Sequence, residues 1–219
     1  MKGNLSLAET RQMLEHVARQ MIASRDLLSE ADRAIGDGDH GVGMERGFEA
    51  VLARLESFNG NDLAALSNAT GMALITSVGG AAGIIFGTWF RGGAKELAGL
   101  TTFDARALHL FLEGGLSAIQ ERGKAKPGDK TMVDALAPAC RVAAQASGLD
   151  LEAALRAVAS AAREGVENTR PMVATLGKAK TLGERSLGYP DPGAISVSLI
   201  LDSMLEFVCM SGEAREQSR

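Results

Sequence analysis

Hydrophobic side chains recur at intervals of three and four residues along most of the chain, a spacing that places them on one face of an α-helix. The first such stretch follows Ser6, which has the spacing of a capping box with Glu9, and it continues to Leu28. One long first helix is therefore predicted. The same pattern predicts seven further helices, over Met44–Leu55, Asp62–Ser77, Ile84–Leu97, Asp104–Arg122, Thr131–Ala146, Leu151–Thr169 and Ala194–Met210.

No stretch of the sequence gives a convincing strand pattern, so no strand is predicted. The composition agrees, because aromatic residues make up only 4% of the chain and hydrophobic residues 46%, which favours packed helices. Turn-forming segments such as Phe58–Asn61 and Ser147-Gly148 separate the helices, and no linker divides the chain. We expect an all-α fold in which residues 1–219 form a single domain.

The stretch Leu63–Phe90 contains no charged side chain and is long enough to span a bilayer. Gly79, Gly83 and Gly87 also have the four-residue spacing that lets transmembrane helices approach closely. Polar residues and the Gly79-Gly80 pair interrupt the stretch, and the other predicted helices have ordinary polar faces. We therefore interpret it as two buried helices that meet at a glycine turn, and expect no association with a membrane.

The formal net charge is −4, and acidic and basic residues are interspersed along the chain. Because no basic block could follow a phosphate backbone, nucleic acid is not an expected partner. Cys140 and Cys209 lie in apolar stretches without the spacing of a metal or redox motif, which favours buried thiols in a reducing compartment. The residues after Met1 lack the apolar core of a signal peptide, so we expect a cytoplasmic protein.

The segment Asp32–Gly41 combines three carboxylates and a histidine with glycines, directly before a predicted helix. A glycine-rich turn can bring Asp37 and Asp39 to one hard cation, with Asp32 reaching in from the end of the preceding helix. Magnesium fits, because it prefers oxygen ligands and often completes its coordination with water and substrate phosphates. A solvated turn that caps the next helix is the open alternative. His40 has three open roles: a buried hydrogen bond, a phosphate contact or a metal ligand.

Two further segments have the composition of anion-binding loops. Ser77–Gly83 lacks bulky side chains and precedes an apolar helix, so its backbone amides can meet phosphate, although small residues equally serve close helix packing. Arg122–Met132 resembles a Walker A loop, but Asp129 stands where the lysine should be and the preceding residues are predicted to be helical. A P-loop is therefore excluded, and this basic turn either contacts phosphate or is simply solvated.

The segment Gly183–Ala194 contains three glycines and two prolines and forms an irregular loop before the last predicted helix. Arg185 is its candidate anion ligand, because a guanidinium can grip two phosphate oxygens at once. The alternative is a structural ion pair with Glu184 or Asp191.

Together these segments resemble the L subunit of dihydroxyacetone kinases, in order and over nearly the whole chain. The matching residues are Gly36-Asp37-Gly38-Asp39-His40-Gly41, Gly71-Met72 with Ser77-Val78-Gly79-Gly80-Ala81, Arg122-Gly123-Lys124 through Lys130-Thr131-Met132, and Leu182-Gly183-Glu184-Arg185-Ser186 through Asp191-Pro192-Gly193-Ala194. Each match alone is weak, whereas the combination is highly specific.

The resemblance implies an eight-helix antiparallel barrel whose loops at one end hold ADP or ATP through two magnesium ions. It implies Asp32, Asp37 and Asp39 as the metal ligands. It implies nucleotide contacts from His40, Gly41, Gly43, Gly79, Gly80, Ala81, Ala82, Gly123, Met132, Arg185, Asp191, Pro192 and Gly193. No side chain of this chain is expected to react covalently, because positioning and charge neutralisation carry phosphoryl transfer.

The resemblance also implies a partner. In the family a separate K subunit holds the ketone covalently through a histidine, so this chain is expected to supply the phosphoryl donor for dihydroxyacetone or a related short ketose such as erythrulose. Two donors are open: resident ADP rephosphorylated by a phosphotransferase-system protein, or ATP that exchanges as a substrate. A regulatory subunit that only binds a partner protein is the alternative function, and a homodimer is compatible with either.

Three positions depart from the family pattern. Ala82 stands where the family often has serine, which removes a hydroxyl contact to phosphate while the backbone contact remains. Thr181 and Tyr189 replace an expected aromatic residue and an expected histidine, which leaves the partner or substrate subtype open.

Overall fold

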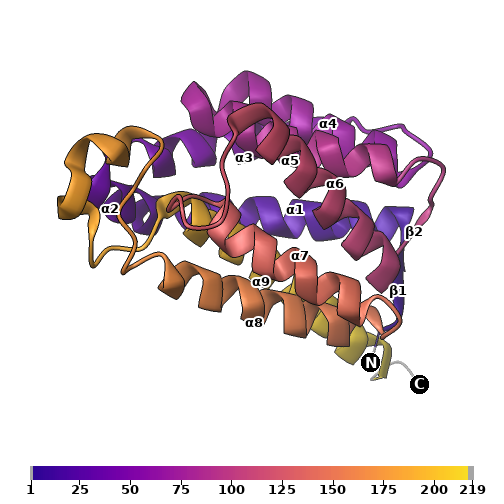
Figure 1. Cartoon of the computed structure of the whole chain (residues 1–219). Helices are drawn as coiled ribbons and strands as arrows, with labels where there is room; N and C mark the ends of the chain where they lie inside the picture. Colours follow the sequence, from indigo (N-terminus) through magenta and orange to yellow (C-terminus); the bar gives the residue numbers. More distant parts are fainter. Residues whose placement is uncertain (1, 217–219) are drawn as a thin grey trace.

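The computed structural model describes residues 2–216, and this part of the chain is mainly helical (Figure 1). The expectation of a mainly helical fold is confirmed. The elements are β1 Asn4–Ser6, α1 Leu7–Ala23, α2 Arg25–Ile35, α3 His40–Glu56, α4 Leu63–Ser77, α5 Gly80–Glu96, β2 Thr102–Asp104, α6 Ala105–Gly123, α7 Val133–Ala146, α8 Leu151–Asn168, the 3-10 helix η1 Lys178–Ser186, and α9 Pro192–Glu216.

The helices pack as a closed ring. Helices that follow one another in sequence contact each other from α3 to α9, α1 contacts both α3 and α9, and α2 packs mainly against α3. Successive helices of the ring reverse direction, so the starts of α3, α5, α7 and α9 lie at the same end of the molecule as the ends of α4, α6 and α8 (Figure 1). β1 and the C-terminal end of α9 lie at the opposite end (Figure 1).

The interior of the ring is filled by one continuous cluster of buried, mostly aliphatic side chains. Four of its aromatic members are packed together: Phe86, Trp89, Phe90 and Phe111 have neighbouring ring centroids 5.4–6.2 Å apart. Aromatic rings contribute more buried area per residue than aliphatic side chains, so this cluster anchors α5 to α6. The start of α5 and the end of α6 lie at the same end of the ring, together with the loops that connect the helices there (Figure 1).

The predicted first helix is in fact two helices. Its start is as predicted, because the Glu9 amide donates to Ser6 Oγ at 3.3 Å and the Ser6 amide donates to the Glu9 carboxylate at 2.8 Å. The break comes at Ser24, whose hydroxyl donates to the Gln20 carbonyl at 2.8 Å, and such side-chain bonds compete with the regular helical pattern. Residues 2–216 therefore contain nine α-helices where eight were expected.

The expectation of no strand was wrong. β1 and β2 form an antiparallel pair in which Leu5 lies opposite Phe103, and both side chains are buried. Each strand has only three residues, which is too short for the alternation of hydrophobic and polar positions to stand out in the sequence.

Helix starts also differ from the predictions, in a way that matters for the site. α3 begins at His40 rather than Met44, and α5 begins at Gly80 rather than Ile84. The extra turns, residues 40–43 and 80–83, consist of glycine and alanine with one histidine and one valine, which give no hydrophobic period to detect. A 3-10 helix, η1, likewise occupies part of what was expected to be an irregular loop. The glycine-rich residues 40–43 and 80–83 are thus the N-terminal turns of α3 and α5. The first amides of each turn lack acceptors within the helix.

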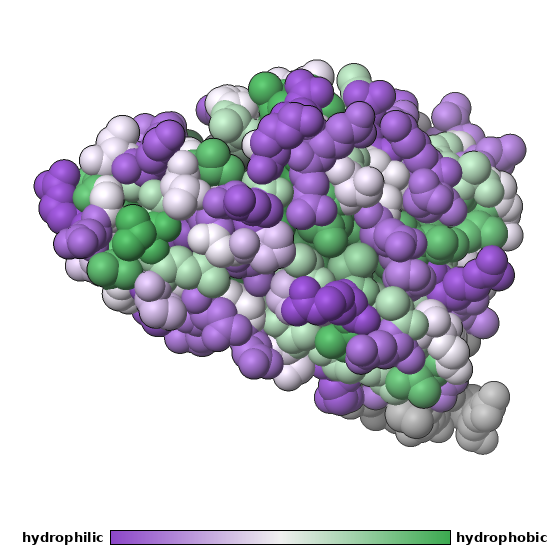
Figure 2. Space-filling view, in the orientation of Figure 1, coloured by the Kyte–Doolittle hydropathy of each residue, from purple (hydrophilic) through white to green (hydrophobic). Residues whose placement is uncertain are grey.

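The apolar stretch Leu63–Phe90 is divided between α4 and α5 by a turn at Gly79, as interpreted from the sequence. One other segment, Pro192–Gly212 of α9, is long and apolar enough to cross a membrane, and half of its most apolar window is buried inside the molecule. Burial in the ring accounts for that composition. Polar residues predominate on the face shown in Figure 2, with smaller apolar patches between them.

Candidate functional site

A cavity of about 440 Å³ opens at the end of the ring where the loops gather, a size within the range of about 300–1,000 Å³ typical of small-molecule sites. Its walls come from α2, α3, the α4–α5 turn with the start of α5, the residues before α7, the start of η1 and the segment that leads into α9. The sequence-predicted residues that line it are Asp32, Asp39, His40, Gly43, Gly79, Gly80, Ala81, Ala82, Met132, Asp191, Pro192 and Gly193.

Four predicted site residues lie outside this lining. Asp37 is exposed beside Asp39, and Arg185 is exposed on η1, where it forms no ion pair among the residues that the structure describes. Gly41 packs α3 onto α2, because an added Cβ would lie 2.0 Å from the Arg25 carbonyl oxygen. Gly123 ends α6, with an added Cβ 3.4 Å from the cavity-lining Ile85.

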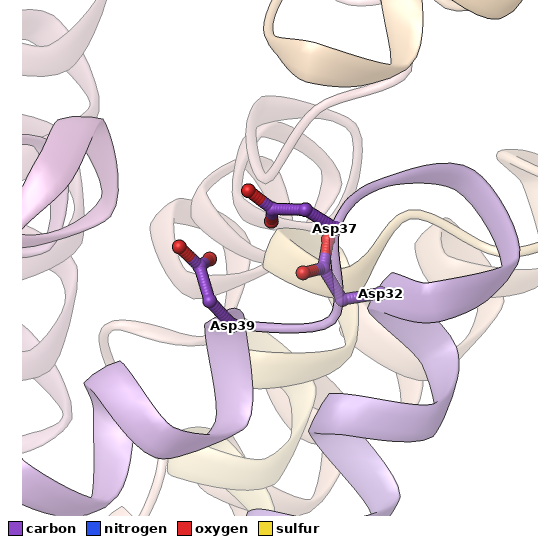
Figure 3. Close-up of side chains that lie close together, drawn as sticks. All are labelled: Asp32, Asp37 and Asp39. Carbon is purple, nitrogen blue, oxygen red and sulfur yellow. The ribbon is translucent and has the colours of Figure 1, made fainter.

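The three predicted metal ligands converge. One carboxylate oxygen each from Asp32, Asp37 and Asp39 lies within 4.8 Å of the others, and Figure 3 shows the three side chains gathered around one space. Asp32 belongs to α2, Asp39 immediately precedes α3, and Gly38 turns the chain between them with a φ of +79°. Asp39 makes no capping hydrogen bond to α3 through its side chain, which counts against the capping alternative. Three clustered carboxylates are the donor set that a hard divalent cation prefers.

This cluster already holds one positive charge. The Lys178 ammonium donates to Asp37 and, at 3.1 Å, to Asp39. The hydrogen bond from Lys178 lowers the pKa of Asp37, and the same bond raises the pKa of Lys178. Lys178 therefore pairs with the carboxylates of Asp37 and Asp39, although it is distant from them in the sequence. The sequence analysis did not identify this lysine as a site residue.

His40 joins the first turn of α3 to α9. Its Nε2 lies 2.8 Å from Ser196 Oγ, and its backbone amide donates to the Asp32 carboxylate at 3.2 Å. Burial lowers the pKa of the imidazole, although Asp32 and Asp39 act in the opposite direction. A neutral imidazole between α3 and α9 corresponds to the buried hydrogen bond, the first of the three roles left open by the sequence. Because His40 also lines the cavity, its position allows a contact with a ligand as well.

The turn between α4 and α5 presents free amides to the cavity. Gly79 and Gly80 have φ values of +83° and +57°, and the first helical hydrogen bond runs from the Gly83 amide to the Gly79 carbonyl at 3.1 Å. The amides of Gly80, Ala81 and Ala82 precede that bond, so they have no helical acceptor. A helix N-terminus of this kind binds anions through its amides and its dipole.

Arg46 stabilises this turn and was missed in the sequence. From α3 it donates through Nε to the Ser77 carbonyl and through Nη2 to the Val78 carbonyl, both at 2.5 Å. These are carbonyls at the C-terminal end of α4, which a helix leaves without partners. Arg46 also lines the cavity, so it adds positive charge beside the free amides of α5. Nothing in the local sequence distinguishes it from any other arginine on a helix.

The loop before α7 is organised by two carboxylates. Asp129 accepts from the Lys126 amide at 2.8 Å and from the Thr175 hydroxyl at 2.7 Å. Asp134 accepts from the Gly128 amide at 2.6 Å and the Thr131 amide at 2.8 Å. Asp129, which stands where a Walker A loop has its lysine, thus stabilises the conformation of this loop.

Lys130, in the same loop, is buried in the cavity wall and was also missed. Its ammonium donates to the carbonyls of Thr169 and Tyr189 at 2.7 and 2.6 Å, which ties the loop to the segment before α9. Its φ of +59° is unusual for a residue with a side chain. Burial lowers its pKa, while Asp191 opposes this effect.

Comparisons with known proteins find a matching family model and similar sequences. A family model described as the DAK2 domain matches residues 34–206. The chain is 39% identical over 181 residues to the PEP-dependent dihydroxyacetone kinase, ADP-binding subunit DhaL, of Escherichia coli (strain K12), covering 82% of this chain and 86% of that protein. It is 34% identical over 206 residues to the PTS-dependent dihydroxyacetone kinase, ADP-binding subunit DhaL, of Lactococcus lactis, covering 93% and 99%.

A solved structure is also similar. The crystal structure of the dihydroxyacetone kinase from C. freundii in complex with AMP-PNP and Mg2+ matches with a TM-score of 0.72 and 25% identity. The match covers 94% of this chain but only 35% of that longer one, so the likeness concerns one part of that kinase.

Proposed function

The chain belongs to the DAK2-domain family and within it to the dihydroxyacetone kinase L subunits, and from this premise we propose that it binds a magnesium nucleotide and donates a phosphoryl group to dihydroxyacetone held on a separate K subunit. The observation that carries the proposal is a juxtaposition: Asp32 and Asp39 line the same cavity as the free amides at the start of α5. One wall suits divalent cations, and the other suits phosphates.

The chain's own residues have distinct tasks in this proposal. The amides of Gly80, Ala81 and Ala82 bind phosphate oxygens, and Arg46 holds the turn that presents them. Asp32, Asp37 and Asp39 hold the cations. Magnesium, when bound, neutralises charge on the phosphates and orients them for in-line attack. No side chain here serves as a nucleophile, since the ketone hydroxyl attacks.

Further features support the finer parts of the proposal. The closed ring of α1 and α3–α9 supports an eight-helix barrel with α2 outside it, and the continuous core supports a single domain. The relatives named above are ADP-binding subunits of PEP- or PTS-dependent kinases, which favours resident ADP that a phosphotransferase-system protein rephosphorylates. Such a relay operates in the cytoplasm, which is where we place the protein.

The test is native mass spectrometry of the purified protein with and without EDTA. We expect ADP and magnesium to co-purify and to be lost with EDTA. Asp37→Asn should lose both, whereas Asp26→Asn, whose side chain is fully exposed on α2, should retain them. A protein that binds no nucleotide even after addition of Mg-ADP or Mg-ATP would overturn the proposal and leave the purely regulatory function. Phosphoryl transfer is then assayed with the K subunit and a donor protein.

A further inference from the structure

Lys178 stands at the first position of η1, a helix that packs against α2, and its side chain reaches the acidic cluster. Its side chain is 59% exposed, and its ammonium contacts the carboxylates of Asp37 and Asp39. Gly177, Lys178 and Ala179 together line the cavity that also contains the free amides of α5. The lysine therefore contacts the proposed cation ligands and lines the same cavity as the proposed phosphate site.

The ammonium and a divalent cation compete for the same oxygens. Asp37 and Asp39 supply two of the three carboxylates of the cluster, and both are engaged by Lys178. Two positive groups a few ångströms apart repel each other, so Lys178 must give up at least part of this contact before the carboxylates can ligate a metal ion.

The displaced lysine remains close to the site. η1 packs against α2, the helix that carries Asp32, so the base of the Lys178 side chain stays beside the cavity. An ammonium on a long flexible stem readily finds a new acceptor, and phosphate oxygens are strong partners for it. The phosphates proposed for this cavity are the nearest anions once the carboxylates are occupied.

We propose that Lys178 exchanges partners when the site is loaded: it pairs with Asp37 and Asp39 in the empty site and with the outermost phosphate of the nucleotide in the loaded one. This inference rests on the proposed function. Its consequence is selectivity, because Lys178 opposes the binding of a free divalent cation but favours the same cation when it arrives with a nucleotide.

Lys178→Met tests the exchange with two binding measurements and no turnover. Binding of Mn2+ alone, followed by electron paramagnetic resonance, should become about two- to fivefold tighter, because loss of an exposed ion pair of modest strength removes the competitor. Binding of ADP in the presence of magnesium, followed by calorimetry, should become about tenfold weaker through loss of a charge-assisted hydrogen bond. Lys178→Arg keeps the charge and should recover most of the ADP affinity.

Lys180→Met is the matched control, since Lys180 is an exposed lysine two positions away that has no hydrogen bond or ion pair within the described part of the chain. It should change neither affinity. Opposite shifts in one variant support the exchange, because partial misfolding would weaken both. If Lys178→Met weakens both affinities, or leaves both at the wild-type value while the wild type binds both ligands, the inference fails and the proposed function stands. If the wild type binds neither ligand, both proposals fail.

Discussion

Asp191 shows how a single residue couples the cavity to the fold. Its carboxylate accepts from the Ala194 amide at 2.8 Å and so caps α9, while the backbone around it lines the cavity. The residue keeps part of its surface exposed, but its carboxylate is enclosed by protein, and this burial raises its pKa to about 7. Asp134 acts in the same direction and Lys130 against it.

The raised pKa predicts a pH-dependent contribution to stability. The folded protein binds the Asp191 proton more tightly than the unfolded chain, whose carboxylate keeps the ordinary pKa of 3.8. The stability that this proton contributes is present below that value and is lost as pH rises toward about 7. Urea unfolding of wild type and Asp191→Asn should therefore show the wild-type advantage shrinking between about pH 4 and about pH 7, since asparagine keeps the cap without titrating.

Asp26→Asn serves as the control, because its carboxylate is fully exposed. As a surface substitution, it should change the free energy of unfolding by no more than about 0.5 kcal/mol. A difference between wild type and Asp191→Asn that does not vary between about pH 4 and about pH 7 would contradict the prediction.

Site residues differ in how visible they are in the sequence. Asp32, Asp37 and Asp39 stand out because carboxylates and glycines are crowded into one short segment. Lys178 does not, because its partner Asp37 is 141 residues away and nothing near it points there. Arg46 and Lys130 cannot be recognised from the sequence either, since each donates hydrogen bonds to backbone carbonyls more than 30 residues away. Only the folded chain brings such pairs together.

At the scale of elements, paired glycines let α5 approach both of its neighbours. An added Cβ on Gly87 would lie 2.5 Å from the Gly71 carbonyl oxygen on α4, and one on Gly92 would lie 2.6 Å from the Gly114 carbonyl oxygen on α6. Small residues in the apolar stretch thus serve both purposes considered from the sequence. Gly79 and Gly80 form the turn, whereas Gly87 permits close packing.

Gly87→Ala should destabilise the protein in spite of the better helix propensity of alanine. Alanine inside a helix is ordinarily favoured over glycine by about 1 kcal/mol, but overpacking against a backbone atom costs about 1–3 kcal/mol. We expect a lower urea midpoint. Gly148→Ala is the control, because an added Cβ there meets nothing within 4 Å. A midpoint for Gly87→Ala at or above that of wild type would show that α4 and α5 can move apart at no cost.

Helix interiors were predictable, whereas several helix starts and the short strands were not. The hydrophobic period identifies α4, α6, α7 and α8 to within about two residues, which is the usual uncertainty of helix ends. The period does not detect residues 40–43 and 80–83, where mostly glycine and alanine begin helices that are held by distant contacts. The functional end of the molecule is therefore the part that local pattern describes least well.

At the scale of the whole molecule, the site joins segments from Asp32 to Gly193, so ligand binding should stabilise the entire fold. At a hundred times its dissociation constant a ligand adds about 2.7 kcal/mol to the free energy of unfolding. We expect ADP with magnesium to raise the Tm in thermal unfolding, and EDTA to abolish the increase.

Two comparisons make this result specific. Asp37→Asn should lose the increase, and adenosine, which lacks phosphates, should give little of it with the wild type. An equal increase with adenosine would place the binding energy outside the acidic cluster and the α5 amides.

Mainly helical architecture could be predicted from composition and hydrophobic period, because both report on local structure. The closure of the ring could not, since contacts of α1 with α3 and α9 join distant parts of the chain. Only the family resemblance led us to expect a barrel of eight helices, and the resemblance itself depends on several short motifs in a fixed order.

The placement of the first and last described elements has a practical consequence. β1 and the C-terminal end of α9 lie opposite the end of the ring at which α3, α5, α7 and α9 begin (Figure 1), and the cavity opens at the latter end. A surface tether, a fluorescent label or an affinity handle attached at either end would leave the cavity mouth facing solution. The cavity of the immobilised protein should therefore remain accessible to partner proteins. This makes the chain suitable for measuring the association and dissociation of such partners on a sensor surface.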